Sequence, residues 1–242
     1  MSIYVILVLS GLFAGFLSGS IGFGGGMIML PIITWYYGME AAVPIAAVAQ
    51  LLSNLSRVFM GLRQINFKSV LWFLLPAAPF TVLGAFGLAV IPKQPATVSL
   101  SVSLIVFAVL KLCGKINLPH NRAVWAAGGG ITGLINGMLG ISGPLSSAVF
   151  LSMELLPVSY VASEATAAAA MHLIKIITYG KLALADSTTL WQGVIIGVAM
   201  MIGNYPALKA INKIDKKKYR KIVAFCLIAA SAFLAVSVII KN

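Results

Sequence analysis

Long, uninterrupted apolar stretches recur along the sequence and restrict the folds that the chain can adopt. Backbone groups cannot stay unpaired in lipid, so a spanning segment must be a helix or part of a closed barrel. The stretches are continuous rather than alternating in polarity, which favours helices. Only 9% of the residues are charged, whereas soluble domains carry about 25%. The sequence therefore predicts an all-α, polytopic membrane protein.

Ten apolar segments can be distinguished, and two of them are short. They lie at 2–20, 27–38, 41–61, 69–91, 95–112, 123–139, 143–156, 158–180, 188–208 and 220–240. A perpendicular span needs roughly 20 residues, which 27–38 and 143–156 lack. We expect these two segments to pair with 2–20 and 123–139 as helical hairpins. The prediction is eight full spans with two short elements, or ten spans if the hairpins cross.

The charge distribution predicts the orientation of the chain. The formal net charge is +12, which in a soluble protein would suggest nucleic acid as a partner. In a membrane protein the surplus fits cytoplasmic loops enriched in Lys and Arg, so no nucleic-acid partner is expected. The loop Lys209–Lys221 carries seven basic residues. Placing it inside puts the loop with Arg63 and Lys68 inside as well, and both termini outside.

An internal repeat relates the two parts of the chain. A shift of 118 residues places Asn54 on His172 and Arg57 on Lys175, and self-similarity of this kind indicates a duplicated fold. The same shift superimposes glycines: Gly11, Gly15, Gly19, Gly22 and Gly25 fall on Gly129, Gly133, Gly137, Gly140 and Gly143.

The repeat predicts two membrane halves, 1–117 and 118–242, of opposite orientation. Each half contains five segments, and an odd number of crossings makes the second half enter from the opposite face. Inverted repeats of this kind are typical of secondary transporters, whose sites lie near the midplane. The alternative is a duplicated membrane scaffold without a transport role.

Glycine-rich breaks interrupt both opening hairpins. The first reads Gly22-Phe23-Gly24-Gly25-Gly26 and the second Gly140-Ile141-Ser142-Gly143-Pro144. Such runs unwind a helix, and the short helix that follows presents unpaired N–H groups and a partial positive charge. Pro144 suits a first helical turn. Two such N-termini from opposite halves would form a cradle for an anion. Gly11, Gly15 and Gly19, and their counterparts in the repeat, are assigned to helix packing.

Polar side chains share one face on each of two later segments. Gln50, Asn54 and Arg57 lie together on segment 41–61, and Glu164, His172 and Lys175 lie together on segment 158–180. Ionisable groups in a membrane usually face a cavity or a partner. Both cations could contact an anion or snorkel to the headgroups. Glu164 could carry a coupling proton or pair with Lys175 or His172.

These observations define the candidate residues. The substrate-binding candidates are Gly22, Phe23, Gly24, Gly25, Gly26, Gln50, Asn54, Arg57, Ser142, Gly143, Pro144, His172 and Lys175, with Glu164 as the coupling-ion candidate. Motifs of metalloproteases, serine hydrolases and P-loop proteins are missing, so no catalytic residue, metal, cofactor or enzymatic activity is expected. Cys113 and Cys226 lie in or beside apolar segments and predict no disulfide.

The chain resembles the sulfite exporter TauE/SafE family, also called the toluene-sulfonate uptake permease family. The resemblance rests on Ala14-Gly15-Phe16-Leu17-Ser18-Gly19 leading into the first break, and on Thr132-Gly133-Leu134-Ile135-Asn136-Gly137 leading into the second. It implies a multi-pass transporter of the bacterial or archaeal cytoplasmic membrane. The implied substrates are small sulfur-containing or organic anions such as sulfite, sulfonates or sulfoacetate.

We therefore expect secondary transport of a small anion, with export as the direction that the resemblance suggests. The expected partners are the lipid bilayer and a coupling proton or sodium ion, and a homo-oligomer is left open. One alternative is an anion channel, which could use the same cradle without alternating access. Another is a membrane subunit or membrane enzyme without a transport role.

Overall fold

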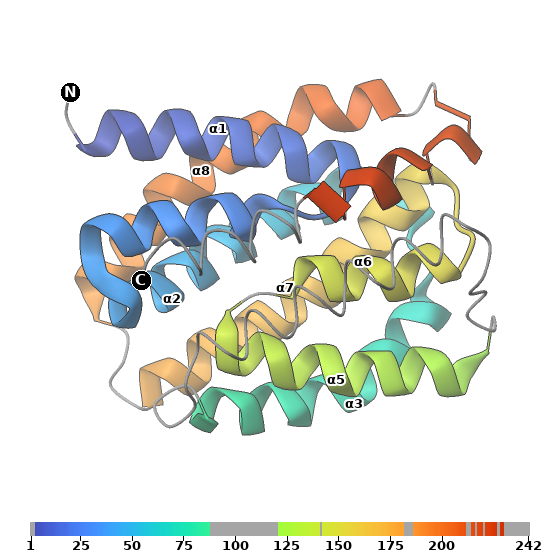
Figure 1. Cartoon of the computed structure of the whole chain (residues 1–242), viewed down its shortest axis with the longest axis horizontal. Helices are drawn as coiled ribbons and strands as arrows, with labels where there is room; N and C mark the ends of the chain where they lie inside the picture. The colour runs from blue at the N-terminus through green and yellow to red at the C-terminus, as the bar shows by residue number, and fades with distance from the viewer. Residues whose placement is uncertain are drawn as a thin grey trace.

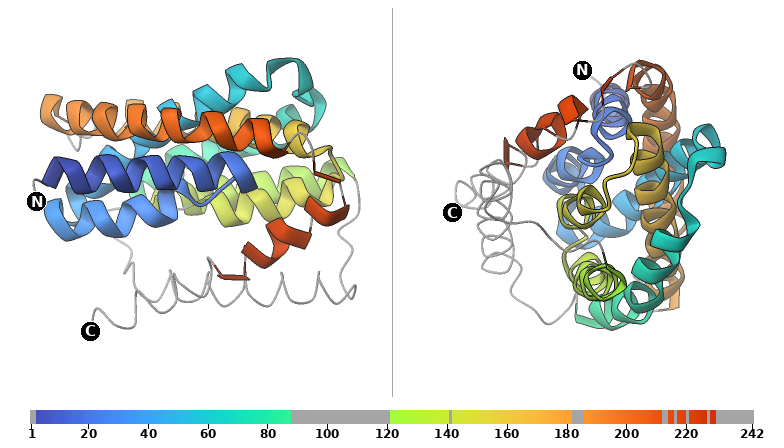
Figure 2. Two further views of the ribbon diagram at one scale, coloured as in Figure 1. Left: turned by 90° about the horizontal axis from the view of Figure 1, so that it is seen from above. Right: turned by 90° about the vertical axis from the view of Figure 1, so that its right-hand side faces the viewer.

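The computed structural model describes residues 3–87, 121–140, 142–181, 186–211, 214–215, 217–219, 221–226 and 228–229, and these contain helices but no strand. The helices lie lengthwise in Figure 1 and are seen end-on in the right-hand view of Figure 2. They are α1 Ile3–Ile21, α2 Gly25–Met60, the 3-10 turn η1 Leu62–Gln64, α3 Phe67–Gly87, α5 Arg122–Leu139, α6 Gly143–Ser152, α7 Pro157–Lys181 and α8 Ser187–Ile211.

Most of the predicted segments correspond to one helix each, but two of them are joined. Segments 27–38 and 41–61 form the single helix α2, which changes direction at Gly38 with φ 77° and ψ 165°. Glycine adopts a positive φ without steric cost, so one residue replaces the connection expected there. The short segment 143–156 is confirmed as short, since α6 ends at Ser152. Segment 95–112 lies outside the described residues.

Four of the described helices are long and apolar enough to cross a membrane: Ile3–Ile21, Ala41–Met60, Phe67–Gly87 and Ser187–Ile211. Helix α7 has a sufficient length of 25 residues, but Glu164, His172 and Lys175 lower its mean hydropathy. The expectation of eight or ten spans also includes segments outside the described residues, so that number stays a prediction.

The distribution of side chains is the reverse of that in a soluble protein. Leu75, Trp191 and Phe225 are each about two-thirds exposed, at 67%, 66% and 68%, whereas Arg57 and Lys175 are buried. Large exposed apolar surfaces mark contact with a membrane or another apolar phase. The bundle therefore presents apolar side chains to lipid and keeps Arg57 and Lys175 inside.

Polar side chains cap helices that begin outside the apolar interior. The Oδ1 of Asn121 accepts a hydrogen bond from the amide of Val124 at the start of α5. At the start of α8, the Oδ1 of Asp186 accepts one from the amide of Thr189. Both are N-cap interactions, which satisfy first-turn amides that have no intrahelical partner.

Glycines bring helices of the two predicted halves into backbone contact. A Cβ atom added at Gly15 of α1 would lie 2.1 Å from the carbonyl oxygen of Met200 in α8. A Cβ atom added at Gly133 of α5 would lie 2.2 Å from the carbonyl oxygen of Ala77 in α3. Small residues allow such close approach in membrane bundles. The packing role predicted for these glycines is thereby confirmed.

The same contacts give the relative directions of the helices. Gly11 of α1 lies against Ile196 and Gly19 against Asn204, so α1 and α8 run parallel. Phe73 of α3 contacts Gly129 of α5, and later residues of α3 contact later residues of α5, so these two helices also run parallel.

The second arm of α2, residues 39–60, runs antiparallel to α7. Arg57 of α2 lies opposite Glu164, whereas Gly61, which follows α2, lies against Ala162 and Val158. Successive positions along α2 therefore meet earlier positions along α7. Arg57 and Glu164, one from each of the polar faces predicted from the sequence, lie opposite one another across this antiparallel pair.

A pair of alanine substitutions in α5 tests the packing role of Gly133. Gly133→Ala is expected to lower the free energy of unfolding by about 1–3 kcal/mol, the usual cost of overpacking. Gly130→Ala in the same helix is the matched control, because its added Cβ would lie 3.6 Å from the nearest atom, in the ring of Phe80. Thermal unfolding in detergent measures both. Equal unfolding temperatures for the two variants would contradict the prediction.

Candidate functional site

Helices α1 and α5, which lie before the two breaks, each end at a glycine in the left-handed conformation. Helix α1 is followed by Gly22 with φ 88°, and α5 by Gly140 with φ 71°. The amide of Gly22 donates to the carbonyl oxygen of Ser18 at 2.9 Å, and the amide of Gly140 donates to that of Asn136 at 3.0 Å. Glycine is favoured at such C-terminal positions because it has no Cβ atom. The two breaks predicted from the sequence are therefore confirmed.

A new helix begins directly after each break. Helix α2 begins at Gly25 after Gly24, whose φ is 101°, and α6 begins at Gly143 after Ser142, with Pro144 in its first turn. No side chain of the described residues caps either start, in contrast to α5 and α8. First-turn amides lack intrahelical partners and carry the positive end of the helix dipole. Both helices therefore present hydrogen-bond donors inside the bundle.

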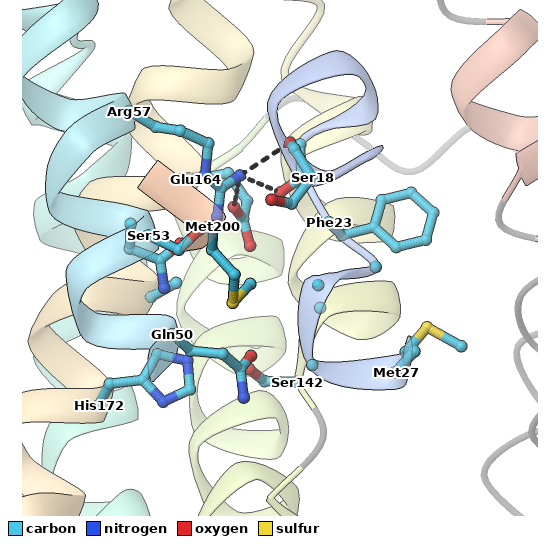
Figure 3. A pocket seen from close by; sticks show the side chains of 17 residues that line it. Ser18, Phe23, Met27, Gln50, Ser53, Arg57, Ser142, Glu164, His172 and Met200 are labelled. Atoms are coloured by element: carbon cyan, nitrogen blue, oxygen red, sulfur yellow. Dashed lines mark hydrogen bonds and ion pairs between the residues drawn. The ribbon is translucent and has the colours of Figure 1, made fainter. Parts of the chain in front are cut away.

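The two helix starts meet. A Cβ atom added at Gly143 would lie 3.1 Å from the Cβ of Phe23 and 3.6 Å from the amide nitrogen of Gly24. A small cavity, partly open to the surface, lies beside them. Its lining, drawn in Figure 3, comprises Ser18, Gly22, Phe23, Gly24, Gly25, Gly26, Met27, Gln50, Ser53, Asn54, Arg57, Ser142, Gly143, Glu164, Ala168, His172 and Met200.

Consecutive glycines at the start of α2 lie close to the ends of other side chains. A Cβ atom added at Gly26 would lie 2.4 Å from the Oε1 of Gln50, and one added at Gly25 would lie 2.5 Å from the Cε of Met200. Any larger residue would displace these neighbours or fill the space between them. The glycine run therefore keeps the N-terminus of α2 accessible from the cavity.

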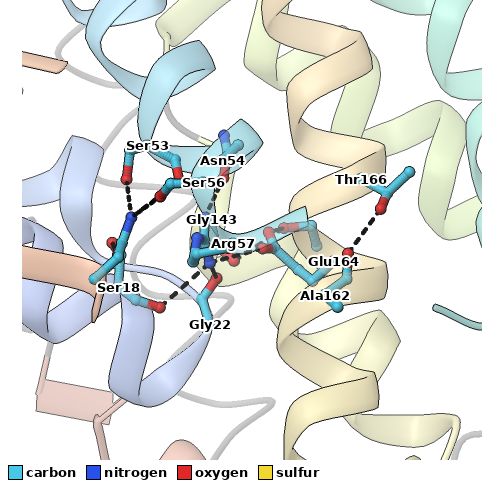
Figure 4. A network of polar contacts seen from close by, with 12 residues as sticks. Ser18, Gly22, Ser53, Asn54, Ser56, Arg57, Gly143, Ala162, Glu164 and Thr166 are labelled. Atoms are coloured by element: carbon cyan, nitrogen blue, oxygen red, sulfur yellow. Dashed lines mark hydrogen bonds and ion pairs between the residues drawn. The ribbon is translucent and has the colours of Figure 1, made fainter. Parts of the chain in front are cut away.

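Arg57 is held by contacts from three helices (Figure 4). Its Nη1 donates to the carbonyl oxygens of Ser18 at 3.2 Å and Gly22 at 2.6 Å. The same nitrogen lies 3.4 Å from the Oε2 of Glu164. Its Nη2 donates to the Oδ1 of Asn54. The guanidinium thus binds the C-terminal end of α1, where the helix dipole is negative.

This geometry decides between the alternatives that the sequence left open for Arg57 and Glu164. Arg57 is 4% exposed, so its side chain does not snorkel to the headgroups. Glu164 forms its ion pair with Arg57 rather than with Lys175 or His172. Its other carboxylate oxygen accepts a hydrogen bond from the Oγ of Ser146 at 2.7 Å. The Arg57–Glu164 pair joins α2 to α7 next to the cavity.

Lys175 and His172 are both buried, but only His172 lines the cavity. The Nζ of Lys175 donates to the Oδ1 of Asn136 in α5 at 3.0 Å, so Lys175 also avoids the headgroups. The Nδ1 of His172 is buried and has no hydrogen-bond partner among the described residues, and the Nε2 of Gln50 is in the same situation. In Figure 3 these two side chains lie on the same side of the cavity.

The structure thus brings together all but two of the predicted site residues, the exceptions being Pro144 and Lys175. Pro144 is buried in the first turn of α6. Sequence reasoning missed five residues of the lining, namely Ser18, Met27, Ser53, Ala168 and Met200. Ser18 could have been found from the repeat, because the 118-residue shift places it on Asn136, so both breaks follow a polar residue by one turn.

A buried polar network adjoins the cavity. The Oδ1 of Asn204 in α8 accepts a hydrogen bond from the Oγ of Ser18 at 3.1 Å. The Nδ2 of Asn204 donates to the Oγ of Ser56 at 2.8 Å and to the carbonyl oxygen of Ser53 at 2.9 Å. These bonds link α1, α2 and α8 around the first break. Within the described residues, no group of three His, Cys, Asp or Glu side chains forms a metal site.

A polar cavity at broken helices, enclosed by apolar helices and flanked by buried ionisable groups, is the arrangement found in membrane transporters. The comparison with protein families agrees, because the family model described as sulfite exporter TauE/SafE matches residues 7–234. The chain belongs to the sulfite exporter TauE/SafE family and is a transmembrane transporter. No curated protein and no solved structure matches the chain.

The contacts of Arg57 predict that lysine cannot replace it. Arg57→Lys keeps the positive charge but loses the planar set of donors that reaches two carbonyl oxygens and two side chains at once. We expect the free energy of unfolding to fall by about 1.5–3 kcal/mol, the usual contribution of one hydrogen bond to a charged group. Arg63→Lys is the control, because Arg63 is exposed. Thermal unfolding in detergent measures the stability of both variants. Equal unfolding temperatures for Arg57→Lys and Arg63→Lys would contradict a structural role for the contacts of Arg57.

Proposed function

We propose that the chain is a secondary transporter of a small sulfur-containing or organic anion, such as sulfite, a sulfonate or sulfoacetate. The observation that carries this proposal is the meeting of two helix N-termini, α2 and α6, which no described side chain caps, at a cavity inside the bundle. Their amides offer hydrogen bonds and partial positive charge where an oxyanion would bind. Ser142 and His172 add polar groups to the same lining.

We further infer that residues 1–117 and 118–242 are inverted repeats. Several observations support this inference. The antiparallel helices α2 and α7 carry the superimposed pairs Asn54–His172 and Arg57–Lys175. Helix α1 packs on α8 and α5 packs on α3 through superimposed glycines, and the left-handed Gly22 and Gly140 occupy matching positions. Rocking of such halves would alternately expose the cavity to the two sides of the membrane.

The direction and the coupling ion are part of the same proposal. Export and a location in the cytoplasmic membrane are inferred from the family. The placement of both termini outside is inferred from the distribution of Lys and Arg. Glu164 is the candidate for proton coupling. Protonation would neutralise its carboxylate and weaken the ion pair with Arg57 that joins α2 to α7. Sodium remains the alternative coupling ion.

Uptake of radiolabelled sulfite into proteoliposomes tests the function. We expect saturable uptake by the wild type and loss of uptake in Gly25→Leu, because the leucine side chain would occupy the space between α2 and Met200. Gly130→Ala, which lies outside the cavity lining, is the control for reconstitution. Non-saturable flux would indicate a channel, and unchanged uptake by Gly25→Leu would contradict a role for this helix start.

A second experiment tests coupling through Glu164. Glu164→Gln is expected to retain exchange of sulfite across the membrane at equal pH, while net uptake no longer responds to an imposed pH gradient. Glu154→Gln, in the turn between α6 and α7, is the matched control and should respond as the wild type does. Repeating the assay with a sodium gradient separates the two coupling ions. A normal response of Glu164→Gln to the pH gradient would exclude this residue as the proton carrier.

A further inference from the structure

The charge balance of the cavity limits the charge of its substrate. Arg57 and Glu164 both line the cavity, and their ion pair adds no net formal charge. The remaining bonds of the guanidinium go to carbonyl oxygens of α1 and to Asn54. Lys175 is bonded to Asn136 and is absent from the described lining. With the pair intact, an anion in the cavity therefore meets no uncompensated cationic side chain among the described residues.

The positive potential of the cavity then comes from the two helix starts. A helix N-terminus carries roughly half of a positive elementary charge. The starts of α2 and α6 lie against each other, with the backbone of Gly143 close to that of Gly24. Together they supply about one positive charge to whatever binds between them. A singly charged oxyanion balances that potential, whereas a doubly charged one leaves a full negative charge unbalanced.

An unpartnered side chain indicates that the cavity is built for a polar ligand. His172 is 1% exposed, lines the cavity, and its Nδ1 has no partner within the described part of the chain. A buried polar atom without a hydrogen bond is costly, and a ligand oxygen in the cavity would supply the missing partner. A neutral imidazole provides one hydrogen bond without adding charge.

We propose that the site binds singly charged oxyanions, such as sulfonates and the singly protonated form of sulfite, in preference to doubly charged ones. This inference rests on the proposed function and specifies its substrate class. The carboxylate of Glu164 contributes to the preference because it offsets the charge of Arg57, so the ion pair offers a second negative charge on the ligand no net attraction. Sulfoacetate, with two negative charges, is expected to bind more weakly than a monoanionic sulfonate of similar size.

Titration calorimetry on the purified wild-type protein tests this preference with two ligands of fixed charge and similar shape. Methanesulfonate carries one negative charge and sulfate carries two. We expect methanesulfonate to bind at least ~10-fold more tightly than sulfate, which corresponds to about 1.4 kcal/mol. Equal or tighter binding of sulfate, or no binding of methanesulfonate, would overturn the proposal.

A substitution at Glu164 tests the electrostatic origin of the preference. Glu164→Gln leaves the charge of Arg57 uncompensated, so the ratio of sulfate affinity to methanesulfonate affinity should rise by ~10-fold or more. Glu154→Gln should leave this ratio at the wild-type value. An unchanged ratio in a folded Glu164→Gln variant would overturn the electrostatic account. If that variant does not fold, the ratio of the two affinities in the wild-type protein alone tests the charge preference.

The outcome is separable from that of the proposed function. A protein that transports sulfite but binds sulfate as tightly as methanesulfonate contradicts only the charge preference. A protein that transports no sulfur-containing anion in vesicles contradicts the proposed function itself.

Discussion

Backbone hydrogen bonding in lipid is the constraint on which the rest of this structure depends. A helix that starts or ends inside the membrane leaves amides or carbonyls unpaired, and each unpaired group is costly there. This chain contains two such interruptions side by side, at Gly22–Gly26 and before Gly143. They persist because packed helices surround them, and glycines such as Gly15 and Gly133 allow those helices to approach to backbone contact.

The two helix ends at the first interruption differ in their hydrogen-bond partners. Its carbonyl end is bound by Arg57, which takes up the oxygens of Ser18 and Gly22. Its amide end, at Gly25, has no described side chain as a cap. The protein thus uses its own cation for the negative end of one helix, whereas the positive end of the next helix faces the cavity. At the second interruption, Lys175 donates to the side-chain Oδ1 of Asn136 rather than to a backbone carbonyl oxygen.

The sequence predicted the elements of this arrangement better than their contacts. Glycine runs and the 118-residue repeat located both breaks, because conformational freedom and short segment length are local properties. The partner of Glu164 and the bonds of Asn204 were not predictable, since they join residues 107 to 186 positions apart. A connection between segments 27–38 and 41–61 was expected, but the sequence did not predict that Gly38 alone would make it. The cavity lining was predicted where the residues followed helical periodicity from Gln50 to Arg57.

The long separation between Arg57 and Glu164 has a consequence for biogenesis. During synthesis, Arg57 enters the membrane region 107 residues before its carboxylate partner exists, and α1 likewise precedes α8 by most of the chain. A chain that stops before α7 would therefore hold a buried cation without its carboxylate partner. A chain that stops before α8 would also leave the glycine face of α1 uncovered.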